Sequence, residues 1–162
     1  MGQFRGHGLS WLAALTVLML LAGCAGPRMQ LQDARGASPP LSIERAMILA
    51  NARQALGMPY RYGGEGPGGV DCSGLVTMAY GAAGIAVPRT ADQQFSRLPR
   101  RETARPGDLL FFGSGDKATH VGVYAGQQQM IHAPGEGREV TVTSLALDYW
   151  QARFLGVAGP AP

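Results

Sequence analysis

Residues 71–84 read Asp-Cys-Ser-Gly-Leu-Val-Thr-Met-Ala-Tyr-Gly-Ala-Ala-Gly. Asp71 is a favourable N-cap and Gly84 a favourable stop, so the stretch predicts a helix between them. Cys72 then falls in the first turn, where free backbone N–H groups and the positive end of the helix dipole stabilise a thiolate. A buried, inert cysteine is the plain alternative. The apolar positions share one helical face: Leu75, Val76, Ala79 and Tyr80.

The flanking segments predict a helix before this stretch and strands after it. Ser42 can cap a helix over residues 43–56, which ends at Gly57. Its apolar residues at helical spacing are Ile43, Ala46, Met47 and Ala50. Short apolar runs predict strands over residues 108–112, 120–125, 130–133, 139–143 and 154–157. Helices followed by an antiparallel run of strands indicate an α+β fold, not alternating βαβ units.

Two histidines lie in the pair of strands at 120–125 and 130–133. If these strands pair symmetrically about Gly126, His120 lies opposite His132, whereas a two-residue loop at 126–127 places them on opposite faces. A working site therefore needs an odd loop or a bulge. His120 would then be the general base for Cys72, and His132 would orient its imidazole. A histidine taken alone is more often a surface residue or a hydrogen-bonded core residue than a catalytic one. A zinc site from the same three residues is an alternative, but no CxxC or HExxH spacing supports it.

Size and charge exclude several classes of protein. The chain has 162 residues, which suits one compact domain. Its formal charge of +3 is small and scattered, so a nucleic-acid partner is not expected. The 24 glycines indicate many turns. The glycine-rich loop at 65–69 lacks the spacings of phosphate-binding motifs, so we expect it to shape a cleft wall.

The N-terminus has the pattern of a secretory signal. A 13-residue apolar run from 9 to 21 is too short to span a membrane, and small residues follow it. The junction Leu-Ala-Gly-Cys at 21–24 resembles the bacterial lipobox, so we expect a lipoprotein signal peptide over 1–23 and lipidation of Cys24. An ordinary cleavage site with an incidental cysteine is the alternative. Ala25 after the cysteine resembles the outer-membrane pattern of Gram-negative lipoproteins.

We therefore expect a lipidated Cys24 and a flexible tether over residues 24–41, followed by a folded domain over residues 42–160. The tether composition is Gly, Pro, Gln, Ala and Ser without apolar periodicity. With Cys24 acylated, Cys72 has no partner in the chain. A lone thiol in an exported protein favours a chemical role.

Six ordered blocks resemble the NlpC family of papain-like bacterial cell-wall cysteine peptidases. They are LGMPYRYGG at 56–64, DCSGLV at 71–76, PRT at 88–90, RPGDLLFF at 105–112, HVGVY at 120–124 and MIHA at 130–133. The resemblance covers residues 45–157 and implies a papain-like fold, with the nucleophile helix packed on a central antiparallel sheet. It also implies hydrolysis of peptide bonds in peptidoglycan stem peptides.

Matched residue by residue, the resemblance implies a catalytic triad of Cys72, His120 and His132. Tyr60 matches a tyrosine beside the nucleophile, where it would help the oxyanion or the substrate. An aromatic packing role is the alternative for Tyr60. Asp71 and Ser73 match substrate contacts, with helix capping an equal alternative for Asp71. Two further residues match positions for which we expect no catalytic role. Arg89 would have a structural role or lie at the cleft edge, and Asp108 would lie in a turn.

The expected reaction is acyl transfer to Cys72 followed by hydrolysis, with no metal or organic cofactor. The preferred bond is the D-alanyl to diaminopimelate cross-link, in the manner of lipoprotein murein endopeptidases. The D-γ-glutamyl to diaminopimelate bond is the alternative, because specificity depends on the cleft walls. A catalytically silent wall-binding lipoprotein, or an acyltransferase or amidase, is a further alternative. We expect a monomer whose partners are stem peptides and, through the lipid, the outer membrane facing the periplasm.

Overall fold

The computed structural model describes residues 27–32, 40–159 and 161–162. The expected signal peptide over 1–23 and the expected lipidation site Cys24 lie outside these residues. No helix in the described part of the chain is long and apolar enough to cross a membrane.

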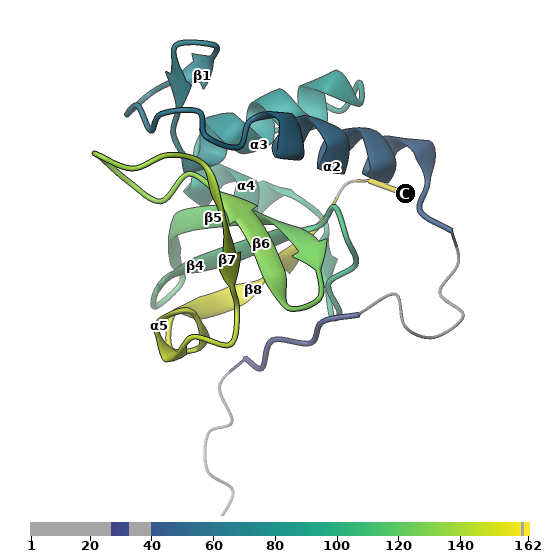
Figure 1. The fold of residues 1–162 in the computed structure, drawn as a ribbon. Helices are drawn as coiled ribbons and strands as arrows, with labels where there is room; N and C mark the ends of the chain where they lie inside the picture. Colours follow the sequence, from purple (N-terminus) through teal and green to yellow (C-terminus); the bar gives the residue numbers. More distant parts are fainter. Residues whose placement is uncertain (1–26, 33–39, 160) are drawn as a thin grey trace, which may run out of the picture.

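The longer helices lie above a six-stranded sheet, and the short helix over Asp148–Gln151 lies on the opposite side (Figure 1). Every strand pairing in that sheet is antiparallel, and the strand order is β3-β8-β4-β5-β6-β7. The α+β prediction is therefore confirmed. The helices are α2 (Ile43–Gln54), α3 (Cys72–Ala82), α4 (Ala91–Arg97) and α5 (Asp148–Gln151). The strands are β3 (Arg100–Arg101), β4 (Leu109–Ser114), β5 (Lys117–Gly126), β6 (Gln129–His132), β7 (Thr141–Ser144) and β8 (Phe154–Ala158), with a separate hairpin of β1 (Glu65–Gly66) and β2 (Gly69–Val70).

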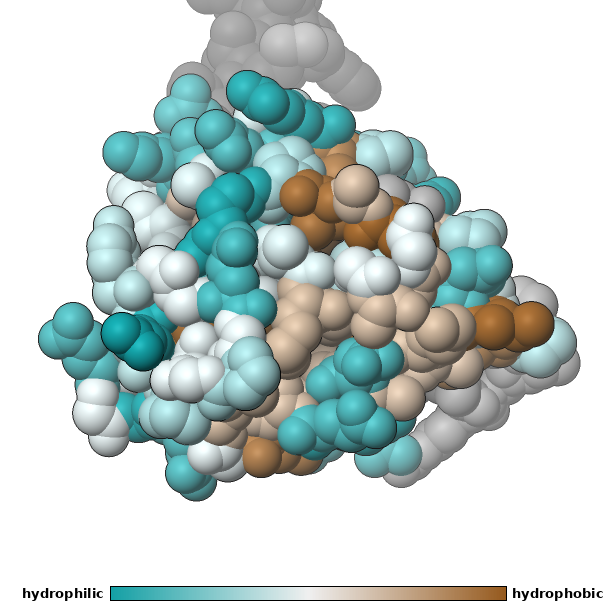
Figure 2. Space-filling view, turned by 90° about the horizontal axis from the view of Figure 1, so that it is seen from above, coloured by the Kyte–Doolittle hydropathy of each residue, from teal (hydrophilic) through white to brown (hydrophobic). Residues whose placement is uncertain are grey.

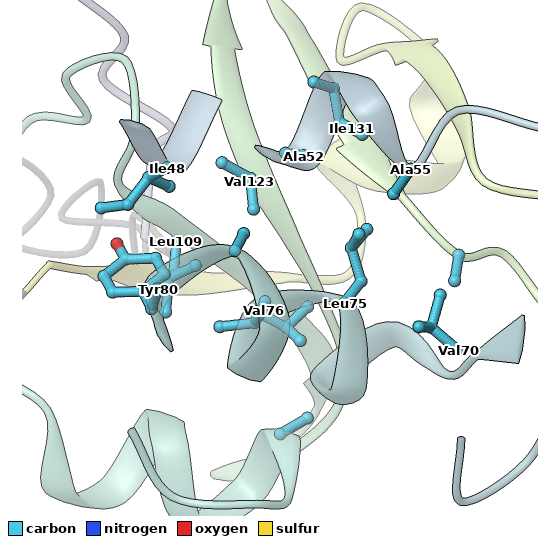
Figure 3. Packing of buried hydrophobic residues seen from close by; sticks show 14 of the residues in the cluster. Ile48, Ala52, Ala55, Val70, Leu75, Val76, Tyr80, Leu109, Val123 and Ile131 are labelled. Atoms are coloured by element: carbon cyan, nitrogen blue, oxygen red, sulfur yellow. The ribbon is translucent and has the colours of Figure 1, made fainter. Parts of the chain in front are cut away.

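The central strand β4 is buried on both faces, because its successive side chains point to opposite sides of the sheet and each side is covered. In β4, Leu109 and Phe111 belong to a core under α2 and α3, whereas Leu110 and Phe112 belong to a second core on the opposite face. Figure 3 shows side chains of α2, α3 and the sheet meeting in the first core. The labelled members include Ile48, Leu75, Val76, Tyr80, Leu109, Val123 and Ile131. This core fixes α3, and therefore its N-terminus, against β5.

Helix α2 packs through a different face from the apolar stripe seen in the sequence. Its buried residues are Arg45, Ile48, Leu49 and Ala52. Ile43 is 76% exposed and Met47 is 40% exposed, so that stripe faces solvent. Figure 2, which looks down on the helical layer, shows hydrophobic surface gathered between polar side chains. Spacing alone does not separate two apolar stripes, and the stripe with Ile48 and Leu49 is the buried one.

Arg45 ties α2 to the end of the chain. Its guanidinium donates to the backbone oxygens of Pro106, Ala161 and Pro162 at 2.6–3.1 Å. It also forms an ion pair of 2.9 Å with Asp108, and both side chains are at most 1% exposed. Asp108 additionally accepts the Arg105 N–H, the turn role expected for it.

Part of the expected tether lies against the domain. The Gln32 N–H donates to the Ala104 oxygen and the Ala104 N–H donates to the Gln30 oxygen, at 2.9 and 2.8 Å. Met29 and Leu31 pack on the second core. Residues 27–32 thus form a docked strap, and tether residues 24–26 and 33–39 lie outside the described part of the chain.

Candidate active site

The cap of α3 is built around one carboxylate. Asp71 accepts the Gly74 N–H at 2.7 Å and the Gly63 N–H at 2.9 Å, so it joins the helix start to the glycine-rich loop. A Cβ on Gly74 would lie 2.0 Å from the Gly64 oxygen, so this close approach requires glycine. The capping role expected of Asp71 is confirmed. Cys72 follows as the first helical residue, half-buried and free of any disulfide.

Burial dominates the electrostatics of the Cys72 thiol. Burial raises its pKa above the ordinary value, against the lowering effect of a hydrogen bond from the Val121 backbone. The helix start therefore does not produce a resting thiolate by itself. Helix α3 packs on β5, and Cys72 packs against the core that includes Val121, the residue after His120. The thiol needs a base to become a nucleophile.

The two histidines are in direct contact. His120 Nε2 lies 2.8 Å from His132 Nδ1, and His132 Nε2 lies 2.9 Å from Thr143 Oγ1. Burial, and then the positive charge of Arg138, lowers the pKa of His120 to about 4. Burial, and then the charges of His120 and Arg138, lowers the pKa of His132 to about 3. Both imidazoles are therefore uncharged at neutral pH.

The β5–β6 hairpin brings the two histidines together in a register that differs from symmetric pairing about Gly126. Val123 pairs with Ile131 and Tyr124 with Met130, so His132 lies beside Gly122 and not directly opposite His120. The register is offset by two residues from symmetric pairing about Gly126. A bulge lies between Tyr124 and Gly126, ahead of a two-residue turn. The bulge keeps both histidines on one face, as the sequence argument required.

Trp150 covers the two imidazoles. Its ring stacks on His120 with centroids 5.4 Å apart at 27°, and meets His132 edge-on at 5.2 Å. The side chain is 9% exposed. Sequence reasoning missed Trp150 and Thr143, because neither belongs to a motif and only the register of β6 and β7 brings Thr143 to the site.

A charge network lies behind the nucleophile. Arg89 forms an ion pair of 2.7 Å with Asp71, another with Glu65, and donates to Ser73 Oγ at 2.9 Å. Burial alone would raise the pKa of Asp71, but hydrogen bonds from Arg89 and Gly74 outweigh burial and lower it. Arg89 thus has the structural role expected of it. Asp71 and Ser73 are 8% and 5% exposed, so substrate contact by either residue stays a prediction.

Tyr60 lies beside the start of α3. Its backbone forms a bridge with Val70, and its N–H donates to the Arg138 oxygen at 2.8 Å. Burial, and then the charges of Cys72 and Asp71, raises the pKa of the Tyr60 hydroxyl. The hydroxyl therefore remains a hydrogen-bond donor at neutral pH.

A cavity of about 800 Å³ opens onto the histidine pair. Its lining includes His120, His132, Arg138, Tyr149 and Trp150. Among the described residues, no group of three or more His, Cys, Asp or Glu side chains has the arrangement of a metal site. The zinc alternative therefore has no geometric support in that part of the chain.

A helix that begins with a cysteine thus packs on an antiparallel sheet that carries two hydrogen-bonded histidines. A family model described as the NlpC/P60 family matches residues 57–159. The chain belongs to the NlpC/P60 family.

Similar proteins include enzymes of bacterial cell walls. The murein DD-endopeptidase MepH of Escherichia coli is 43% identical over 111 residues, which cover 64% of this chain and 41% of MepH. The bifunctional muramidase/DL-endopeptidase CwlT of Bacillus subtilis is 37% identical over 110 residues, covering 64% and 33% of the two chains. The crystal structure of an NlpC/P60 family protein from Bacillus cereus has a TM-score of 0.68 at 30% identity, covering 73% of this chain and 40% of that one. The chain thus spans less than half the length of these curated relatives.

Proposed function

We propose that this chain is a cysteine endopeptidase that hydrolyses peptide bonds in peptidoglycan stem peptides. Cys72 is the nucleophile, His120 the general base and His132 the residue that orients it. The observation that carries the proposal is the hydrogen-bonded series from His120 on β5 through His132 on β6 to Thr143 on β7, in a sheet on which the helix that begins with Cys72 packs. Family membership and the similarity to murein endopeptidases support the substrate class.

The tautomers follow from the direction of proton transfer. If His120 Nδ1 accepts the thiol proton, its Nε2 carries a hydrogen and donates to His132 Nδ1. His132 Nε2 then carries a hydrogen and donates to Thr143 Oγ1. In this direction of the series His120 carries its hydrogen on Nε2, which leaves Nδ1 free to act as a base.

The reaction then proceeds in two stages. His120 takes the thiol proton as the Cys72 sulfur attacks the scissile carbonyl, and a tetrahedral oxyanion forms. The Cys72 backbone N–H and the Tyr60 hydroxyl donate to this oxyanion. The imidazolium gives its proton to the leaving amine, which leaves an acyl-enzyme. Water, deprotonated by His120, releases the acyl group and restores the thiol.

For the scissile bond we propose the D-alanyl to diaminopimelate cross-link. MepH, named a DD-endopeptidase, is more similar to this chain than CwlT, whose name includes a DL-endopeptidase. The D-γ-glutamyl to diaminopimelate bond is the second candidate, on the similarity to CwlT.

Mass spectrometry of muropeptides tests the function and the bond together. Purified cross-linked muropeptides are incubated with the wild type and with Cys72→Ala. We expect products that depend on Cys72 and whose masses correspond to opening of the cross-link. Masses from cleavage within one stem would favour the second bond. No products from a folded protein would refute the peptidase and favour a wall-binding or transferase role.

We also propose that Cys24 is lipidated and that the lipid holds the domain at the outer membrane, facing the periplasm. The support is the sequence Leu-Ala-Gly-Cys at 21–24 with Ala25 after it. Attachment to the membrane raises the local concentration of enzyme at the wall. Replacement of Cys24 should reduce activity in cells but leave activity on soluble muropeptides unchanged. Equal losses in the two assays would contradict the anchor.

A further inference from the structure

One exposed guanidinium lines the cavity that opens onto the histidine pair. Arg138 lies between β6 and β7 and contributes to the same cavity wall as His120 and His132. The only other lining residue with a formal charge is Glu139. The cavity therefore combines a cation with the two histidines, whereas Cys72 is not among its lining residues.

The backbone of Arg138 is held in place from two sides. Its N–H donates to the Gly135 oxygen at 3.2 Å, which closes the turn. Its carbonyl accepts the Tyr60 N–H at 2.8 Å, so the residue is joined to the segment that leads to Cys72. The base of the side chain is therefore fixed relative to the nucleophile.

The charge of Arg138 has no ionic partner in the part of the chain that the structure describes. The ion pairs there join Arg45 to Asp108 and Arg89 to Glu65 and Asp71. One side-chain hydrogen bond, of 3.2 Å, runs from Arg138 Nη2 to the Pro134 oxygen. A guanidinium has five N–H donors in a planar fork that matches a carboxylate, so most of its donor capacity remains available.

We propose that Arg138 forms a carboxylate-binding subsite for the leaving half of the substrate, and so selects stem peptides whose diaminopimelate residue keeps a free carboxylate. This inference rests on the proposed peptidase function. Both candidate bonds release an amine of diaminopimelate, and His120 is the group that gives that amine its proton. The half of the substrate that carries the amine would therefore occupy the cavity shared by His120 and Arg138.

The electrostatics of the site agree with this assignment. Arg138 is close enough to both imidazoles to lower the pKa of each. A bound carboxylate would offset this positive charge and so ease the formation of the His120 imidazolium. Substrate binding and proton transfer would thus be coupled through one residue.

The test uses two synthetic muropeptides that differ only at this carboxylate, free in one and amidated in the other. We expect the wild type to hydrolyse the free form with a kcat/KM roughly tenfold to a hundredfold higher, as for a charge-assisted hydrogen bond. Arg138→Gln should lose this preference, and Arg138→Lys should keep part of it. Arg53→Gln removes the same charge from the last turn of α2 and should keep the full preference.

A wild type without the preference, or an Arg138→Gln variant that retains it, would overturn the subsite. Calorimetric binding of the two peptides to Cys72→Ala separates this result from failure of the peptidase proposal. If the wild type hydrolyses neither peptide, the binding data still test the subsite. Tighter binding of the free form to Cys72→Ala that is lost in Cys72→Ala/Arg138→Gln would support the subsite alone, whereas equal or absent binding would refute it.

Discussion

The hydroxyl of Thr143 ends the hydrogen-bonded series, so Thr143→Val should prevent His120 from acting as a base although His120 itself is unchanged. His132 is 2% exposed, and its Nε2 lies 2.9 Å from the hydroxyl. In the variant, an N–H at this position would be buried without a partner. His132 would avoid this by carrying its hydrogen on Nδ1, which faces His120. His120 would then carry its own hydrogen on Nδ1 and could not accept the thiol proton.

The magnitude follows from the cost of the lost partner. A buried donor left unpaired costs about 1–3 kcal/mol, so the productive tautomer becomes roughly 5-fold to 150-fold less populated. We expect kcat/KM on cross-linked muropeptides to fall by that factor. Thr143→Ser, which keeps the hydroxyl, should retain most of the activity.

Two measurements check the reasoning. Steady-state hydrolysis by the wild type and both variants gives kcat/KM, and ¹⁵N NMR of the imidazole nitrogens reports which nitrogen of His120 carries the hydrogen. Full activity in Thr143→Val would refute the argument. So would a loss of activity with the His120 tautomer unchanged.

Three further predictions concern stability. The pKa of His120 is lowered to about 4, so the folded state is destabilised as the pH falls below about 6.5. The loss of stability is roughly 3 kcal/mol at pH 4. The urea midpoints at pH 7.5 and pH 4.5 should therefore differ more in the wild type than in His120→Gln. Arg45→Leu leaves the buried Asp108 unpaired and should cost about 3–5 kcal/mol, whereas a loss below 1 kcal/mol in urea unfolding would contradict the role of the ion pair. Gln128 has a φ of 54°, so Gln128→Gly should stabilise the turn by up to about 1 kcal/mol, and a lower melting temperature would oppose this.

The residues with intrinsic reactivity could be predicted from the sequence. The position of Cys72 in the first turn of a helix could be predicted from the capping residue Asp71, because capping is a local effect. His120 and His132 lie in short apolar runs whose strands were predicted to within a few residues. The α+β class followed from the order of these elements.

The parts that depend on packing between elements could not be predicted. The offset of β5 and β6 depends on a bulge, and no residue type at Ala125 signals it. Trp150 and Thr143 reach the histidines only through tertiary contacts. The buried face of α2 was hidden because the helix carries two apolar stripes.

The docked strap over residues 27–32 would limit how far a domain lipidated at Cys24, as proposed, could stand from a membrane. A free chain from residue 24 to residue 40 would reach about 55 Å at full extension. With the strap paired to Ala104, only the link from residue 24 to residue 27 would separate the proposed lipid from the domain, a reach of about 10 Å. The proposed endopeptidase, held so closely, would act on wall lying against its own membrane, and release of the strap would extend its working range severalfold.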